Sequence, residues 1–117
     1  MAKVIVGKQN LRVEIGFLEA FQSLQRSFEI SLERVRGATE DSQYIQSGLG
    51  LRSPGTGLPN MIAKGNYRKK GERIFALWHR GQETVVVELK NSKWDRLVLG
   101  CDNAKALAEE INRAIQN

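Results

Sequence analysis

Ser53, His79 and Cys101 are candidates for a nucleophile or an acid–base group in this sequence. His79 is the single histidine and lies in a run of alternating aromatic and aliphatic residues, which favours a packed or rim position over a general base. No basic pattern near Cys101 would lower its pKa, so we expect a small buried hydrophobe there. A Ser53–His79–Asp95 set can be drawn, but nothing in the spacing brings these residues together. The sequence therefore predicts that the protein is not an enzyme.

The stretch 48–57 contains enough glycine to be tested as a phosphate-binding loop. Gly50 and Gly55 have the required spacing, but Thr56-Gly57 stands where that motif needs a lysine and a hydroxyl residue. Metal binding would need several histidines, cysteines or carboxylates at ligand spacing, and the chain offers only isolated candidates. We expect no cofactor and no metal, and we interpret residues 40–60 as a long Gly/Pro-rich loop.

The basic residues are concentrated in the middle of the chain. The formal net charge is +5, and the segment from Lys64 to Arg96 holds nine Lys or Arg residues against four Asp or Glu residues. That distribution indicates either an anionic partner or a solvated surface that keeps the protein soluble. Segment 67–73 places four cations and one aromatic residue at an expected hairpin tip. The candidate binding residues are Lys64, Tyr67, Arg68, Lys69, Lys70 and Arg73.

Length and composition predict one domain over residues 1–117 in a reducing compartment. At 117 residues the chain can bury a core of its own, and no apolar run reaches the ~20 residues of a membrane span. The first residues lack the apolar region of a secretory signal. Cys101 is the only cysteine, so no internal disulfide can form. We therefore expect a cytoplasmic protein.

Alternating hydrophobicity predicts strands in the N-terminal part of the chain. The first two strands are expected over 3–8 and 11–15. Helical spacing follows over 17–25, where a short helix would lie on the sheet. A third strand is expected over 28–39, with a bulge or bend at Gly37.

Periodicity returns at Met61 and continues to the C-terminus. A tight turn is expected over Lys69–Glu72, and Asp102 occupies the position of a helix N-cap. The last helix would place apolar side chains on one face. The expected elements are strands over 61–68, 73–80, 84–89 and 94–101, followed by a helix over 103–115.

These elements together resemble a small bacterial pleckstrin-homology-like family of uncharacterised proteins. The residues that carry the resemblance are Leu51–Pro59, Gly65–Tyr67, Gly71–Phe75 and the hairpin Val85–Leu99. It covers nearly the full length. The resemblance implies an α+β, mainly β fold: a pleckstrin-homology-like barrel of about seven antiparallel strands in two packed sheets, capped by a C-terminal helix. It implies no catalytic activity.

Lipid-binding versions of that fold usually gather Lys and Arg around the first hairpin, which here holds only Lys3, Lys8 and Arg12. The leading hypothesis is therefore a non-catalytic binding or scaffold module that recognises a protein or peptide through a sheet edge, a loop or a helix-flanking groove. The alternative is peripheral association with anionic lipids through the basic hairpin 67–73, at the inner face of the membrane. Nucleic-acid binding would require more cations and several exposed aromatic residues. No oligomeric state is predicted.

Overall fold

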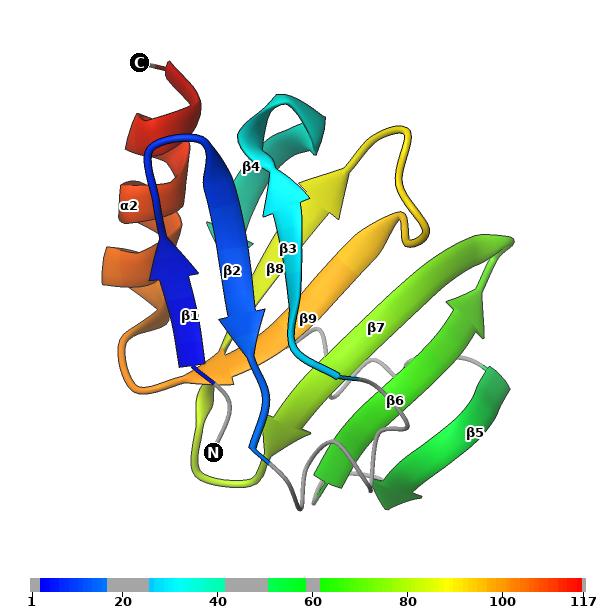
Figure 1. Ribbon diagram of the computed structural model, residues 1–117. Coiled ribbons are helices and arrows are strands. Elements are labelled where there is room, and N and C mark those ends of the chain that lie inside the picture. Colours follow the sequence, from blue (N-terminus) through cyan, green and yellow to red (C-terminus); the bar gives the residue numbers. More distant parts are fainter. Residues whose placement is uncertain (1–2, 17–25, 42–50, 59–61, 117) are drawn as a thin grey trace.

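The computed structural model describes the backbone of residues 3–16, 26–41, 51–58 and 62–116, and the side chains of all of these except 51–58 and 62–64. It is a mixed α+β fold, mostly strands in two sheets with a helix at the C-terminus, as predicted (Figure 1). The smaller sheet has the order β1-β2-β3, from β1 (Lys3–Val6), β2 (Asn10–Glu14) and β3 (Phe28–Ser31). The larger sheet has the order β4-β8-β9-β7-β6-β5, from β4 (Val35–Glu40), β5 (Leu51–Leu58), β6 (Ile62–Lys69), β7 (Glu72–His79), β8 (Glu83–Leu89) and β9 (Arg96–Cys101).

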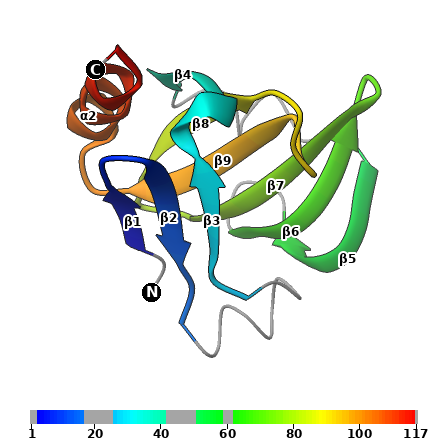
Figure 2. The same cartoon turned by 45° about the horizontal axis from the view of Figure 1, so that its top comes forward.

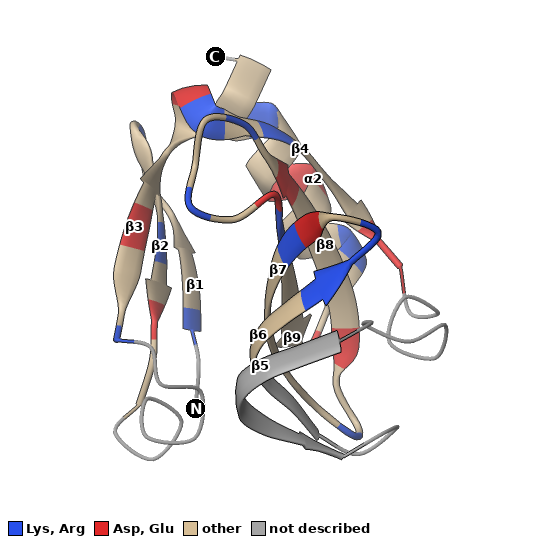
Figure 3. Ribbon diagram, turned by 90° about the vertical axis from the view of Figure 1, so that its right-hand side faces the viewer, with Lys and Arg blue, Asp and Glu red and all other residues tan. Residues whose placement is uncertain are grey.

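The sheets face each other but are not closed into a barrel, so that part of the prediction is wrong (Figure 3). Within the described residues there are nine strands rather than about seven, and no strand of one sheet pairs with the other sheet. The predicted third strand is divided in two by the 3-10 turn η1 (Leu32–Arg34), where the Ser31 hydroxyl accepts the Glu33 N–H at 3.4 Å. A local side-chain bond of this kind competes with strand pairing. β3 therefore stays in the smaller sheet, while β4 begins the larger one.

Part of the predicted loop 40–60 is a strand, which is a second correction. β5 pairs with β6 at the edge of the larger sheet, and its register shifts between Arg52 and Gly55. Pro54 lies within that shift; an edge position or a bulge is where a strand accommodates a residue without an N–H. The rest of the loop at 42–50, and the helix expected over 17–25, lie outside the described residues.

Strand β9 lies between β8 and β7, and its pairing with β7 is parallel (Figure 1). The prediction that all strands are antiparallel is therefore wrong for this pair. Leu97, Val98, Leu99 and Gly100 are all buried, so β9 is covered on both faces. Consecutive apolar residues of this kind favour a central strand, and β9 occupies the centre of the sheet.

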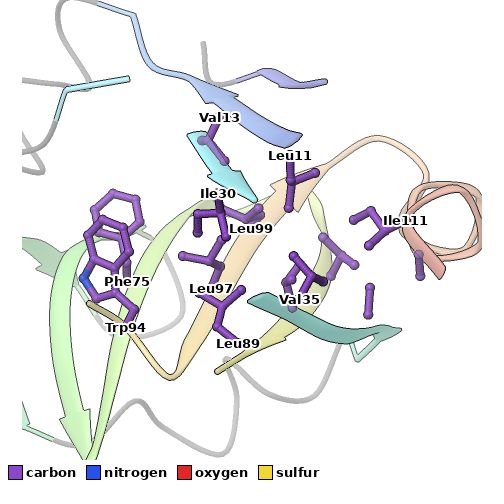
Figure 4. Close-up of a cluster of buried hydrophobic side chains, with 14 of the residues drawn as sticks. Leu11, Val13, Ile30, Val35, Phe75, Leu89, Trp94, Leu97, Leu99 and Ile111 are labelled. Atoms are coloured by element: carbon purple, nitrogen blue, oxygen red, sulfur yellow. The ribbon is translucent and has the colours of Figure 1, made fainter. Parts of the chain in front are cut away.

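The main core lies between the two sheets and the helix (Figure 4). Leu11, Val13 and Ile30 of the smaller sheet pack toward Leu97 and Leu99 of the larger sheet. Burying each such side chain stabilises the fold by about 1.5–3 kcal/mol. A second buried cluster occupies the opposite face of the larger sheet, as the alternation of side chains along its strands requires: Tyr67, Ile74, Ala76, Trp78, Val86 and Val98.

An aromatic cluster closes one side of the main core. Phe28 of β3 lies 5.7 Å from Phe75 and 4.8 Å from Trp94, measured between ring centroids. The Trp94 indole N–H donates to Asn66 Oδ1 at 2.8 Å. Trp94 is therefore buried with its polar atom satisfied.

The helix α2 (Ala104–Gln116) packs along the edge strand β4 (Figure 2). Asn103 rather than Asp102 is its N-cap, since the Asn103 Oδ1 accepts the Ala106 N–H at 3.1 Å. At the other contact, Asn112 Oδ1 accepts the Ala38 N–H and Asn112 Nδ2 donates to the Ala38 carbonyl, both at 2.9 Å. The amide thus satisfies backbone groups that the edge strand would otherwise leave open.

Candidate functional site

The turn between β6 and β7 is the tight hairpin that the sequence predicts. Lys70 (φ +52°) and Gly71 (φ +82°) both have positive φ, as a two-residue type I′ turn requires. The register places Arg68 opposite Arg73. Arg68 and Lys70 are exposed and Lys69 is half-buried, so the turn presents cations at one end of the larger sheet (Figure 3).

Arg73 holds the β8–β9 loop against the start of β7. Its backbone N–H donates to Asp95 Oδ2 at 2.8 Å, and its Nε lies 3.4 Å from the same oxygen. Its Nη2 donates to the Ser92 carbonyl at 3.1 Å. The backbone and side-chain bonds from Arg73, together with the charge of Arg68, lower the pKa of the Asp95 carboxyl below its ordinary value. Arg73 is therefore a structural contact as well as a surface charge.

Arg96 engages two further carboxylates at the same end of the sheet. Its Nε lies 3.2 Å from Glu72 Oε2, and its Nη2 lies 3.6 Å from Glu88 Oε1. These pairs and the Arg73–Asp95 pair occupy the carboxylates nearest the β6–β7 turn. Arg68 and Lys70 form no ion pair within the described part of the chain.

The structure adds basic residues that the candidate list from the sequence lacks. Arg34 of η1 donates from Nη1 to the Asn91 carbonyl at 2.8 Å, and the Lys90 N–H donates to the Arg34 carbonyl at 2.8 Å. Lys93 Nζ lies 5.1 Å from the centroid of the Trp94 ring. Lys90 and Lys93 belong to the basic segment from Lys64 to Arg96, so the sequence could have indicated them as candidates. Arg34 is far away in the sequence and is brought here only by the tertiary fold.

These residues define what we term the cationic end of the larger sheet. It comprises η1, the β6–β7 turn and the β8–β9 loop, and its basic residues are Arg34, Arg68, Lys69, Lys70, Arg73, Lys90, Lys93 and Arg96. The acidic residues described at this end are Glu33, Glu72, Glu88 and Asp95. Among the described residues the opposite end has an acidic balance, since Arg80 and Lys105 stand there with Glu40, Asp41, Glu83 and Asp102. Charge is therefore separated along the strands.

Two of the predicted binding residues do not belong to this surface. Tyr67 is only 8% exposed and lies in the second buried cluster, so its prediction as an exposed aromatic residue at the tip is wrong. The alternation along β6 turns its ring toward Ile74 and Val98 rather than toward solvent. Lys64 pairs with Leu77 in the β6–β7 ladder, well away from the turn, and its side chain lies outside the described residues.

Of the candidate catalytic residues, His79 and Asp95 are not brought together, and the side chain of Ser53 lies outside the described residues. His79 ends β7, whereas Asp95 contacts Arg73 near the start of that strand. Six residues of strand separate these ends by about 20 Å. His79 Nδ1 lies 3.0 Å from the Arg80 carbonyl oxygen. His79 and Asp95 therefore do not form an acid–base pair.

Cys101 is half-buried at the end of β9. Burial raises the pKa of its thiol, and the neighbouring Glu83 and Asp102 carboxylates raise it further. The neutral thiol is a poor nucleophile and a poor metal ligand.

Neither a metal cluster nor a membrane-spanning helix is found in the described parts of the chain. Their histidine, cysteine and carboxylate side chains form no group of three or more suited to a metal ion. None of their helices combines the length and the apolar character needed to cross a bilayer. No family model, no curated protein and no solved structure matches the chain significantly.

Proposed function

We propose that the protein is a non-catalytic binding or scaffold module that recognises an acidic segment of a protein or peptide partner through the cationic end. The observation that carries this proposal is the separation of charge along the larger sheet. A surface of one sign steers an oppositely charged partner and orients it before contact. Arg68 and Lys70 are exposed at the β6–β7 turn and supply charge for such a contact.

A protein partner is favoured over a membrane because the described part of the cationic end offers no apolar anchor. Tyr67 and Trp94, the aromatic residues nearest to it, are both buried. Among the described residues, the exposed large hydrophobic side chain is Ile5, which belongs to the smaller sheet. The alternative, association with anionic lipids through hairpin 67–73, would then depend on charge alone, at about 1 kcal/mol for each cation near the surface.

The sequence resemblance supports the non-catalytic part of the proposal. A pleckstrin-homology-like relationship implies no catalytic activity, and two facing sheets with a C-terminal helix are compatible with it. We extend the proposal to a cytoplasmic location, in line with the single cysteine of the sequence.

The test is the affinity of the purified protein for a fluorescein-labelled, glutamate-rich peptide, measured by anisotropy at low and at physiological salt. The double variant Arg68→Glu/Lys70→Glu should weaken binding at least about tenfold, because attraction becomes repulsion. Arg80→Glu is the matched control: it reverses an exposed charge at the opposite end and should leave the affinity near that of the wild type.

Vesicles with and without phosphatidylglycerol provide the second arm. The proposal expects peptide binding to persist at physiological salt while co-sedimentation with anionic vesicles does not. Sedimentation at physiological salt that the double variant abolishes, without peptide binding, would establish the lipid alternative and overturn the proposal. Equal loss in the Arg80→Glu control would also overturn it, since the cationic end would then not be the site.

A further inference from the structure

The β8–β9 loop, residues 90–95, is held at both ends by backbone hydrogen bonds. The Lys90 N–H donates to the Arg34 carbonyl at 2.8 Å, and the Leu89 N–H donates to the Asp95 carbonyl at 2.9 Å. The Asp95 N–H donates to the Arg73 carbonyl at 2.7 Å. In Figure 1 the loop lies between η1 and the β6–β7 turn. Its shape is therefore fixed in the free protein, and binding would not have to order it.

Two arginines set the orientation of two successive peptide groups in this loop. Arg34 Nη1 donates to the Asn91 carbonyl at 2.8 Å, and Arg73 Nη2 donates to the Ser92 carbonyl at 3.1 Å. Arg34 approaches from the β4 side of the β8–β9 pair, whereas Arg73 approaches from the β7 side. The carbonyl and the N–H of a trans peptide group point in opposite directions. The Ser92 and Lys93 N–H groups are therefore directed toward the middle of the loop.

These N–H groups have no acceptor within the described residues, and the same holds for the Asn91 N–H. Asn91 has a φ of +53°, in the left-handed region, so the backbone turns sharply at this point. Asn91 and Lys93 are exposed and Ser92 is half-buried. Successive free N–H groups in a turn of this kind form a concavity suited to an anion.

Positive side chains surround the free N–H groups. Lys90 and Lys93 are both exposed, and Lys93 Nζ lies 5.1 Å from the centroid of the Trp94 ring, which keeps the ammonium group beside the loop. Asp95, the one acidic residue of segment 90–95, is bonded to Arg73. The loop thus combines backbone donors with positive charge, while its own carboxylate is already engaged.

We propose that the Ser92 and Lys93 N–H groups together receive one side-chain carboxylate of the acidic partner segment, while Lys90 and Lys93 supply the charge that attracts it. The inference rests on the proposed function and assigns a contact point within the cationic end. Hydrogen bonds from N–H groups to a carboxylate are charge-assisted and directional, so they orient the partner as well as attract it. Arg34 and Arg73 are positioning residues, because they act through the carbonyls of the loop.

The test is a titration of the isotope-labelled protein with the glutamate-rich peptide, followed by NMR. An amide proton that donates to a carboxylate moves downfield, so the Ser92 and Lys93 amide protons should both move downfield along one binding curve. Arg34→Gln releases the Asn91 carbonyl and should abolish the downfield shift at Ser92. Arg36→Gln is the matched control: it removes the same charge at an exposed position that donates no bond to the loop within the described part of the chain, and it should preserve the shift.

A backbone variant isolates the N–H group without a change of charge. Replacing the Lys93 N–H by an ester oxygen, through the α-hydroxy analogue of lysine, should weaken peptide binding about tenfold, since one bond to a charged group is lost. The matched control is the same replacement at Lys70, an exposed turn residue whose N–H also has no acceptor among the described residues. That control should bind the peptide nearly as tightly as the wild type.

The outcomes separate this inference from the proposed function. Absence of the downfield shifts, with peptide binding that Arg68→Glu/Lys70→Glu still abolishes, would overturn the loop site and leave the proposed function standing. Equal weakening by the esters at Lys93 and Lys70 would also overturn the loop site. Downfield shifts at Ser92 and Lys93 with inorganic phosphate, and none with the peptide, would overturn the assignment of a carboxylate. Failure of the peptide to bind at all would overturn both proposals.

Discussion

At the scale of single residues, Asp95 explains how so many cations coexist at one end of a sheet. Arg68 and Arg73 are direct cross-strand neighbours, and like charges in that position repel. Asp95 accepts bonds from Arg73 and lies close enough to Arg68 for that charge to lower the pKa of its carboxyl. One carboxylate from the β8–β9 loop thus stabilises the hairpin that carries both arginines.

The lowered pKa of Asp95 gives a pH-dependent stability. Its folded-state pKa lies below the ordinary value of 3.8, so its contribution is fully present above that pH and is lost as the pH falls through the folded-state value. We expect Asp95→Asn to lower the free energy of unfolding by about 0.5–1 kcal/mol at neutral pH, since the pair is partly exposed. The difference from the wild type should shrink below about pH 4. Urea unfolding across this range measures it, with Glu110→Gln on the exposed face of α2 as control; a difference that is constant with pH would contradict the assignment.

Residue types alone could predict the β6–β7 turn but not which of its side chains face solvent. The Lys70-Gly71 step is a local signal, and it is confirmed. The exposure of Tyr67 depends on strand register and on what covers that face of the sheet, which no local pattern contains. Arg73 likewise looked like a free tip charge because its partner, Asp95, comes from another loop.

At the scale of elements, the β7–β8 connection passes the end of β9, and a glycine makes this possible. The Gln82 side chain lies against Gly100, and a Cβ added there would collide with Gln82 Oε1. That same oxygen accepts the His79 N–H at 3.1 Å, and the Gln82 carbonyl accepts the Trp78 indole N–H at 3.0 Å. The side chain therefore cannot move away without losing the bond to His79.

Gly100→Ala should lower the free energy of unfolding by about 1–3 kcal/mol through this overpacking. Gly37→Ala is the control in the same sheet, because its nearest neighbour, Asn112 Oδ1 at 3.8 Å, is at ordinary contact distance. Chemical denaturation measures both variants. Adding Gln82→Ala to Gly100→Ala should recover part of the loss, and a double-mutant cycle quantifies the coupling. Equal stability of the two alanine variants would contradict this explanation.

Most elements were predictable because their signals are periodic and local. The strands of the second half and the C-terminal helix are of this kind, and the bulge expected at Gly37 coincides with the register shift between Val35 and Gly37. The positions of the elements within the two sheets were harder to predict from the sequence. A three-residue 3-10 turn redirects the chain between sheets, and β9 enters between β7 and β8 although the chain order suggests two simple hairpins. The turn between the sheets and the insertion of β9 both depend on which surfaces become buried against each other in the tertiary fold.

At the scale of the whole molecule, the fold converts a basic segment of sequence into a directional charge distribution. The sequence places the excess between Lys64 and Arg96. Strand direction then sends most of these cations to one end, because β6 and β8 end there and β7 and β9 begin there. The candidate site was therefore predictable as a region, whereas Arg34 and its contact with the β8–β9 loop required the tertiary structure.

The most direct measurement is a map of amide chemical shifts while the isotope-labelled protein is titrated with the glutamate-rich peptide. We predict changes at Arg34, at 68–73 and at 90–93, which are the segments of the cationic end, at salt concentrations near physiological. Amides around Arg80 and Glu83, at the opposite end of the same strands, should stay unchanged. Changes centred on that opposite end or on the outer face of α2 would contradict the claim that the cationic end is the binding surface.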